Sequence, residues 1–162
     1  HAFMENLDFS KKDGLEIQLE ELISCGKMSR EESRVLRLSD IRKFLASGCG
    51  KRMAAASARG QLYREHPFVL GVPADEIRPE WSHEETVLVQ GIIDACFREE
   101  DDTISILDYK TDHVSHPQEL VERYRAQLDY YALALERLTG CRVKDRIIYS
   151  FHFGKEILIP PK

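Results

Sequence analysis

The strongest constraint on the fold is a pair of apolar, β-branched segments separated by five charged residues. The first covers residues 86–97 (TVLVQGIIDACF), the second covers residues 103–109 (TISILDY), and the turn between them reads REEDD. Segments of this composition are typical of β-strands. A turn this short brings consecutive strands back antiparallel. We therefore predict a β-hairpin in the middle of the chain.

The segments around this hairpin predict an α/β fold. Residues 68–72 favour a short strand and residues 118–138 favour a long helix. Residues 146–153 and 155–159 favour either one more strand or a hairpin that turns at Gly154. The order of helices, three strands, a helix and more strands indicates an α/β sandwich around a short mixed sheet.

The N-terminal third reads as helical. Helix-like apolar spacing recurs in residues 15–23, 41–45 and 54–58. Ser29 and Glu32 form an S-x-x-E capping box, which predicts a helix start. We expect a break at residues 48–50 (Gly-Cys-Gly). The division we predict is a helical segment over residues 1–60 and a core over residues 61–162.

Composition excludes several classes of protein. With 43% apolar and 31% charged residues, the chain is an ordinary globular protein and neither disordered nor collagen-like. It has no apolar run long enough to span a membrane. Four scattered cysteines without a C-x-x-C pair indicate reduced thiols in a cytoplasmic protein and not a zinc or iron–sulfur site. Because the first residue is His1 and not Met, we expect a piece of a longer chain.

Charge is distributed unevenly along the chain. Residues 27–64 contain ten basic and three acidic residues, although the whole chain has a net charge of −5. A local excess of positive charge is typical of a surface that meets a polyanion. A solvated basic face on ordinary helices explains the same pattern. Charge alone leaves both interpretations open.

Two aspartates and a lysine give the clearest chemical signal. Asp94 interrupts the first strand of the hairpin, and Asp108 and Lys110 lie near the end of the second. If the hairpin turns near residues 100–101, Asp94 lies opposite Asp108, and Lys110 points to the same face as Asp108. Two carboxylates this close repel each other, and a divalent cation removes the conflict. We therefore predict a metal site; a hairpin end with incidental acids is the alternative.

The long helix carries a second signal. Its apolar stripe comprises Leu120, Tyr124, Leu128, Tyr131, Leu135 and Leu138. Gln127 falls on the same stripe, so we expect a buried amide that needs hydrogen-bond partners. We predict either that the Gln127 amide reaches the active site or that Gln127 is a structural residue of the core.

These motifs together resemble a known family. The run GIID, thirteen residues, DYKT and then Q-L-x-x-Y is similar to the RecB family of nuclease domains in the PD-(D/E)XK superfamily. Within that family, the segments REHPFVLGVPADEI and ILDYKTDHV are most similar to the nuclease domains of AddA-type helicase–nucleases. The resemblance covers residues 61–153 well and the helical first third only loosely.

The resemblance implies a fold, a site and a chemistry. The fold is a restriction-endonuclease-like α/β core, a short mixed β-sheet flanked by helices, with a helical N-terminal segment. The implied catalytic residues are Asp94, Asp108, Lys110, Gln127, Tyr131 and Glu65, the last from its place in an E-x-P-F segment. The implied metal ligands are Asp94, Asp108 and His1, which resembles a metal-binding histidine of the family's early helix. The implied cofactor is Mg²⁺, with Mn²⁺ as a substitute.

Three functional hypotheses follow. The first is a metal-dependent DNA nuclease domain, an exonuclease within a bacterial helicase–nuclease for double-strand break repair and recombination. The resemblance then implies DNA as substrate, a cytoplasmic location and an AddB-like partner subunit, with ATP chemistry elsewhere because this chain has no Walker A motif. The second is a non-catalytic DNA-binding module with the same fold, against which the intact aspartates and lysine argue. The third is a free-standing RecB-like exonuclease.

Overall fold

The structure is a computed structural model that describes residues 2–161, except for the side chain of Lys12. Its helical part comprises α1 (Ala2–Asn6), the 3₁₀ helix η1 (Phe9–Gly14), α2 (Leu15–Ser24), α3 (Arg30–Val35), α4 (Leu38–Ala46) and α5 (Gly48–Ala58). The rest comprises β1 (Leu62–Pro73), α6 (Ala74–Ile77), β2 (Thr86–Arg98), β3 (Ile104–Lys110), α7 (Pro117–Thr139), β4 (Val143–Ser150) and β5 (Lys155–Leu158).

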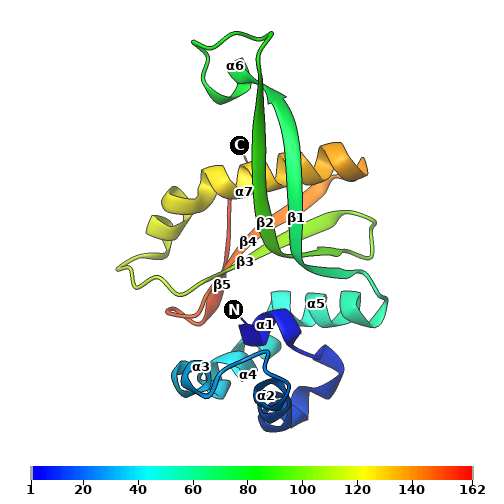
Figure 1. Cartoon of the computed structure of the whole chain (residues 1–162), viewed down its shortest axis with the longest axis vertical. Coiled ribbons are helices and arrows are strands. Elements are labelled where there is room, and N and C mark those ends of the chain that lie inside the picture. The colour runs from blue at the N-terminus through cyan, green and yellow to red at the C-terminus, as the bar shows by residue number, and fades with distance from the viewer. Residues whose placement is uncertain (1, 162) are drawn as a thin grey trace.

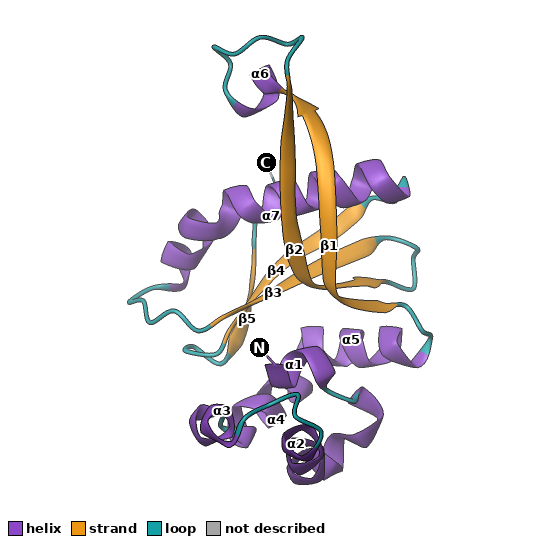
Figure 2. Cartoon of the chain, viewed as in Figure 1, coloured by secondary structure: helices purple, strands orange, loops and turns teal. Residues whose placement is uncertain are grey.

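The strands form one mixed sheet in the order β1-β2-β3-β4-β5. Strands β1, β2 and β3 pair antiparallel, β3 and β4 pair parallel, and β5 returns antiparallel to β4. The parallel pair requires a crossover, and α7 supplies it. Figure 2 shows α7 on one side of the strands and α1–α5 gathered below them. The predicted α/β class, with a short mixed sheet flanked by helices, is confirmed.

Two apolar cores cover the two faces of the sheet. The core beneath α7 contains Leu120, Leu128, Leu135, Ile93, Ile106 and Ile148. The core beneath the N-terminal helices contains Phe3, Phe44, Met53, Phe97, Leu107 and Tyr149. Strand β3 contributes to both, since Ile106 and Leu107 are each fully buried and face opposite sides. The β3 strand is therefore the central element of the molecule, and a charge placed on it is hard to hydrate.

The β1–β2 ribbon is longer than the sequence predicted. Strand β1 pairs with β2 over its whole length, whereas only its apolar centre, residues 68–72, was recognisable as a strand. Phe68 and Leu70 are buried and Val69 between them is 58% exposed, which is the alternation of a strand covered on one face. Figure 1 shows the ribbon projecting beyond the rest of the sheet, with α6 at its tip.

The predicted break at residues 48–50 is wrong. These residues form the first turn of α5, and the chain changes direction one residue earlier, at Ser47. The Ser47 side chain caps α5 by accepting a hydrogen bond from the Gly50 amide at 3.1 Å. A Cβ atom on Gly50 would lie 2.1 Å from the Phe44 carbonyl oxygen. Glycine is needed here for close packing of two helices and not to end one.

The structure also bears on the predictions about the cysteines and about membrane spans. All four cysteines are free thiols. Among residues 2–161, no helix combines the length and the apolar character that crossing a membrane requires.

Gly50 provides a test of this packing. We expect Gly50→Ala to lower the free energy of unfolding by about 1–3 kcal/mol, because the added methyl group meets backbone that must shift. Gly14→Ala is the matched control, since nothing lies within 4 Å of a Cβ there. Urea unfolding of both variants of the 162-residue chain measures the difference. Equal stability of the two variants would contradict the close approach of α4 and α5.

Candidate active site

The hairpin brings Asp94 and Asp108 together as the sequence predicted. The β2–β3 pairing runs inward from the turn as far as Ala95 and Leu107, and the next step of the same register places Asp94 opposite Asp108. The Tyr109 amide donates a hydrogen bond to Asp94 Oδ2 at 3.0 Å. This bond fixes the Asp94 carboxylate against the backbone of β3, beside Asp108.

Asp108 is a buried carboxylate in electrostatic conflict. The residue is only 3% exposed. Burial, together with the neighbouring Asp94 carboxylate, raises the pKa of Asp108 to about 7, although the Lys110 ammonium opposes the rise. The buried Oδ2 atom of Asp108 accepts no hydrogen bond of ordinary geometry within the described part of the chain, but it lies 2.8 Å from Lys110 Nζ. Asp108 therefore has a second carboxylate and one ammonium as close neighbours.

Lys110 is enclosed from both sides. Its side chain is 17% exposed, and its ammonium lies between Asp108 and the ring of Tyr124, whose centroid is 3.9 Å from Nζ. The sequence placed Tyr124 on the apolar stripe of α7, and its partly buried ring does pack against the core beneath that helix. The ring also covers the lysine, which spacing along a helix could not show.

The expectation that Gln127 is buried is wrong. Gln127 is exposed, and so is Leu138 with 57% exposure, because a helix buries only those stripe positions that meet the sheet. The Gln127 amide donates a hydrogen bond to Tyr131 Oη at 2.8 Å. Tyr131 itself is buried, and burial together with the charges of Asp108 and Asp94 raises its pKa. The Q-x-x-x-Y pair thus reaches the carboxylates through Tyr131.

Glu65 lies across the ribbon from Asp94. The β1–β2 pairing on either side of it continues in one register, which places Glu65 opposite Asp94. Its φ of 47° is rare for a residue with a side chain and marks an irregular point in β1. Burial and the charges of Glu5 and Asp108 raise the pKa of Glu65. Glu65 is therefore a third carboxylate that interacts electrostatically with the site.

Helix α1 is tied to this edge by Arg64. Its guanidinium donates hydrogen bonds to the carbonyl oxygens of Met4 and Glu5, both at 3.2 Å, and lies over the Phe9 ring. No pattern in the sequence predicts this contact. His1, the expected histidine ligand, lies outside the described residues 2–161, so its role stays a prediction.

The donor set of the site fits a hard divalent cation. Magnesium favours one or two carboxylates, with water and phosphate oxygens as the remaining ligands. Asp94 and Asp108 supply two carboxylates whose mutual repulsion and burial leave an unmet need for positive charge. Within residues 2–161, no group of three or more His, Cys, Asp or Glu side chains is arranged to hold a metal. The pair therefore suits an ion that keeps much of its hydration.

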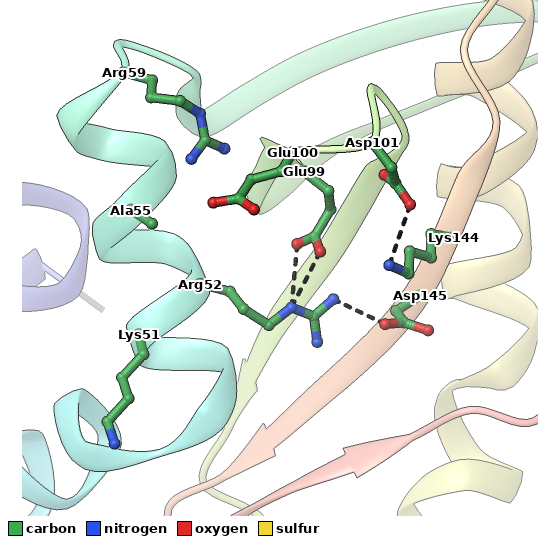
Figure 3. Close-up of a pocket in the computed structure, with 9 residues that line it drawn as sticks. All are labelled: Lys51, Arg52, Ala55, Arg59, Glu99, Glu100, Asp101, Lys144 and Asp145. Carbon is green, nitrogen blue, oxygen red and sulfur yellow. Dashed lines mark hydrogen bonds and ion pairs between the residues drawn. The ribbon is translucent and has the colours of Figure 1, made fainter.

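A hollow of about 650 Å³ lies at the opposite end of β3 and differs in its electrostatics. Figure 3 shows that several of its charged side chains form ion pairs with each other. Arg52 donates to Glu99 at 3.1 Å and to Asp145 at 2.8 Å, and Lys144 lies 3.2 Å from Asp101. These ion pairs join α5, the hairpin turn and β4. They give the hollow a structural role, whereas the aspartate pair is left with a deficit of positive charge.

Comparison with known proteins identifies the family. Residues 1–156 match the PD-(D/E)XK nuclease superfamily. The chain belongs to this superfamily. It is 39% identical over 161 residues to AddA, an ATP-dependent helicase/nuclease subunit, of Acetivibrio thermocellus, covering 96% of this chain and 12% of that protein. The protein of the same name from Clostridium botulinum strain Alaska E43 is 40% identical over 166 residues, covering 98% of this chain and 13% of its own length.

These matches confirm the resemblance to AddA-type nuclease domains. They also extend it, because the matched region includes the helical N-terminal third that the motifs covered only loosely. The chain spans about an eighth of the length of these relatives. The superfamily supports a nuclease; the roles of the individual site residues stay predictions.

The raised pKa of Asp108 predicts a pH dependence of stability. Because the folded-state pKa of about 7 exceeds the ordinary value near 4, this carboxyl stabilises the metal-free fold below about pH 4 and loses that contribution as pH rises through 7. Asparagine does not ionise, so Asp108→Asn lacks this pH-dependent contribution. As the pH rises from about 4.5 to 8, the free energy of unfolding of Asp108→Asn should therefore increase relative to that of the wild type, by a few kcal/mol at most.

Chemical denaturation in EDTA across this pH range measures the gain. Asp101→Asn is the control, because hydrogen bonds from Thr103 lower the pKa of Asp101 to about 2, well below the range tested. Its difference from the wild type should stay constant. Parallel pH profiles for wild type and Asp108→Asn would show that the Asp108 carboxyl ionises normally.

Proposed function

We propose that this chain is a metal-dependent deoxyribonuclease domain that hydrolyses phosphodiester bonds. The observation that carries the proposal is the buried Asp108 beside the partly buried Asp94, with the Lys110 ammonium 2.8 Å from Asp108. Membership of a nuclease superfamily supports the same reaction class. A non-catalytic DNA-binding module would have no need to keep a buried carboxylate and a second carboxylate in mutual repulsion.

In this proposal the aspartates hold the metal and the lysine serves the chemistry. Asp94 and Asp108 would bind Mg²⁺, with Mn²⁺ as a substitute and His1 and Glu65 as further contributors. Bound there, the ion supplies charge for the phosphate oxygens and lowers the pKa of water. Lys110, held beside Asp108, orients the attacking water or balances charge that develops on the phosphate.

Tyr131 and Gln127 contribute from α7. Since Gln127 donates to Tyr131 Oη, the tyrosine's own proton is left to donate toward a substrate oxygen. Tyr131 is further fixed by the Phe68 ring, 5.4 Å away between centroids, and a Cβ atom on Gly91 would lie 3.4 Å from its ring. Such fixation makes a hydroxyl an effective donor.

The wider context is also proposed. The names of the relatives combine a helicase and a nuclease. We infer that the chain acts as an exonuclease on DNA within a bacterial helicase–nuclease, in double-strand break repair and recombination. A cytoplasmic location and an AddB-like partner subunit belong to the same inference.

Metal binding and cleavage test the proposal together. Asp108→Asn should lose Mg²⁺ binding in calorimetric titration. Asp13→Ala, which removes an exposed carboxylate from η1, should bind as the wild type does. Lys110→Met should still bind the metal and lose ~10² to 10⁴ in cleavage rate, because it removes a charge and keeps the stem.

Lys144→Met is the matched control for the lysine, since Lys144 is paired with Asp101 at the far end of β3. It should cleave normally. Equal Mg²⁺ binding by wild type and Asp108→Asn would refute the metal site. DNA binding without cleavage by the wild type, with every metal supplied, would favour the non-catalytic module.

Gln127 separates a site role from a structural one. Because its amide is exposed, Gln127→Leu should lower the free energy of unfolding by no more than about 1 kcal/mol, the contribution of one hydrogen bond. It removes the hydrogen bond that orients Tyr131, so cleavage should fall about tenfold, as expected for loss of about 1 kcal/mol of hydrogen bonding. Thermal unfolding and cleavage rates on the same preparation measure both. Full cleavage by this variant would remove Gln127 from the site.

A further inference from the structure

Lys110 has a second neighbour besides Asp108, and that neighbour comes from another element. The Tyr124 ring lies on α7, and its centroid is 3.9 Å from Lys110 Nζ, well inside the range of cation–π attraction. Asp108, by contrast, lies on the same strand as Lys110 and its carboxylate is the group expected to bind the metal. Of the two contacts that the Lys110 ammonium makes, the one with Tyr124 therefore does not involve the expected metal ligand Asp108.

The Tyr124 ring is itself held in place. Its hydroxyl donates a hydrogen bond to Asp112 Oδ2 at 2.7 Å, and Arg123 donates to the same oxygen at 2.7 Å. Asp112 lies two residues after Lys110, at the start of the loop between β3 and α7. The loop is therefore tied back onto the helix that follows it, with the ring closed over the lysine.

The hydrogen bond also strengthens the ring as a partner for a cation. A phenol that donates to a carboxylate gains electron density, and the face of the ring becomes more negative. The Lys110 stem is largely buried, so the ammonium has little freedom to leave the ring for solvent. The Tyr124 ring, the Asp112 carboxylate and the loop between β3 and α7 together define one position for Lys110 Nζ.

We propose that the Tyr124 ring is a positioning group that holds the Lys110 ammonium beside Asp108. The proposal rests on the proposed nuclease function for its kinetic consequence. Its structural part, the contact between the Tyr124 ring and Lys110, does not depend on that function. Substitution of a group that aims a reacting side chain lowers turnover more than substrate binding.

Two variants of Tyr124 separate the ring from the hydroxyl. Tyr124→Phe keeps the ring over Lys110, and Tyr124→Leu removes it. Tyr130→Leu is the matched control, because Tyr130 is a tyrosine of the same helix that faces a different hollow, beside Glu76 and Arg146. All three are made in the 162-residue chain.

The first measurement needs no activity. In metal-free protein with ¹³C-labelled lysine, the Lys110 Hε resonances should lie upfield of those of the other lysines, because they sit over an aromatic ring. Lys110→Met identifies them by their loss. The upfield position should persist in Tyr124→Phe and Tyr130→Leu and disappear in Tyr124→Leu. An unshifted Lys110 signal in the wild type, or no change in Tyr124→Leu, would overturn the proposal.

The second measurement is the kinetics of DNA cleavage. Tyr124→Leu should lower kcat about 10- to 100-fold with KM nearly unchanged, the pattern of a misplaced reacting group. Tyr124→Phe should recover most of the loss and Tyr130→Leu should match the wild type. Normal kcat in Tyr124→Leu, with an active wild type, would overturn the positioning role and leave the nuclease function standing. An inactive wild type with the expected lysine resonances would refute the nuclease function and retain the contact.

Discussion

The repulsion between Asp94 and Asp108 is the constraint on which the rest of the site depends. Strand β3 is buried on both faces, so neither water nor the chain itself readily compensates a charge at Asp108. The fold nevertheless puts a second carboxylate beside it and supplies one ammonium close to Asp108. Such an arrangement is unfavourable unless something else brings positive charge. In the proposed function, a bound cation would relieve this cost.

The geometry that enforces this repulsion comes from elements far apart in the sequence. The hairpin register sets the two aspartates opposite each other, and the Tyr109 amide fixes Asp94. Helix α7 closes the site from one side through Tyr131 and Tyr124. The two apolar cores hold β3 between them. Moving the two carboxylates apart would therefore require repacking of apolar side chains on both faces of the sheet.

The sequence allowed the hairpin and its carboxylates to be predicted because both follow from local rules. A charged turn of known length sets the register, and the register sets which side chains face each other. Helix faces were harder to predict. The spacing of α7 put Gln127 on the buried stripe, but burial depends on where the sheet ends, which is a property of the whole fold. The break expected at residues 48–50 failed for a related reason, since Gly50 serves packing between α4 and α5.

The two ends of β3 show how the same kinds of charge can serve opposite purposes. At the turn, Arg52 bridges Glu99 and Asp145 and Lys144 pairs with Asp101, so that two cations meet these three carboxylates and join α5 to the sheet. At the other end, Lys110 pairs with Asp108 and is also engaged by the Tyr124 ring, while Asp94 is held by the backbone amide of Tyr109. Adding a cation at the turn would displace existing ion pairs, whereas adding one at the aspartate pair would relieve repulsion. Charge balance, more than the size of a hollow, therefore distinguishes the end of this strand that we propose to be reactive from the structural one.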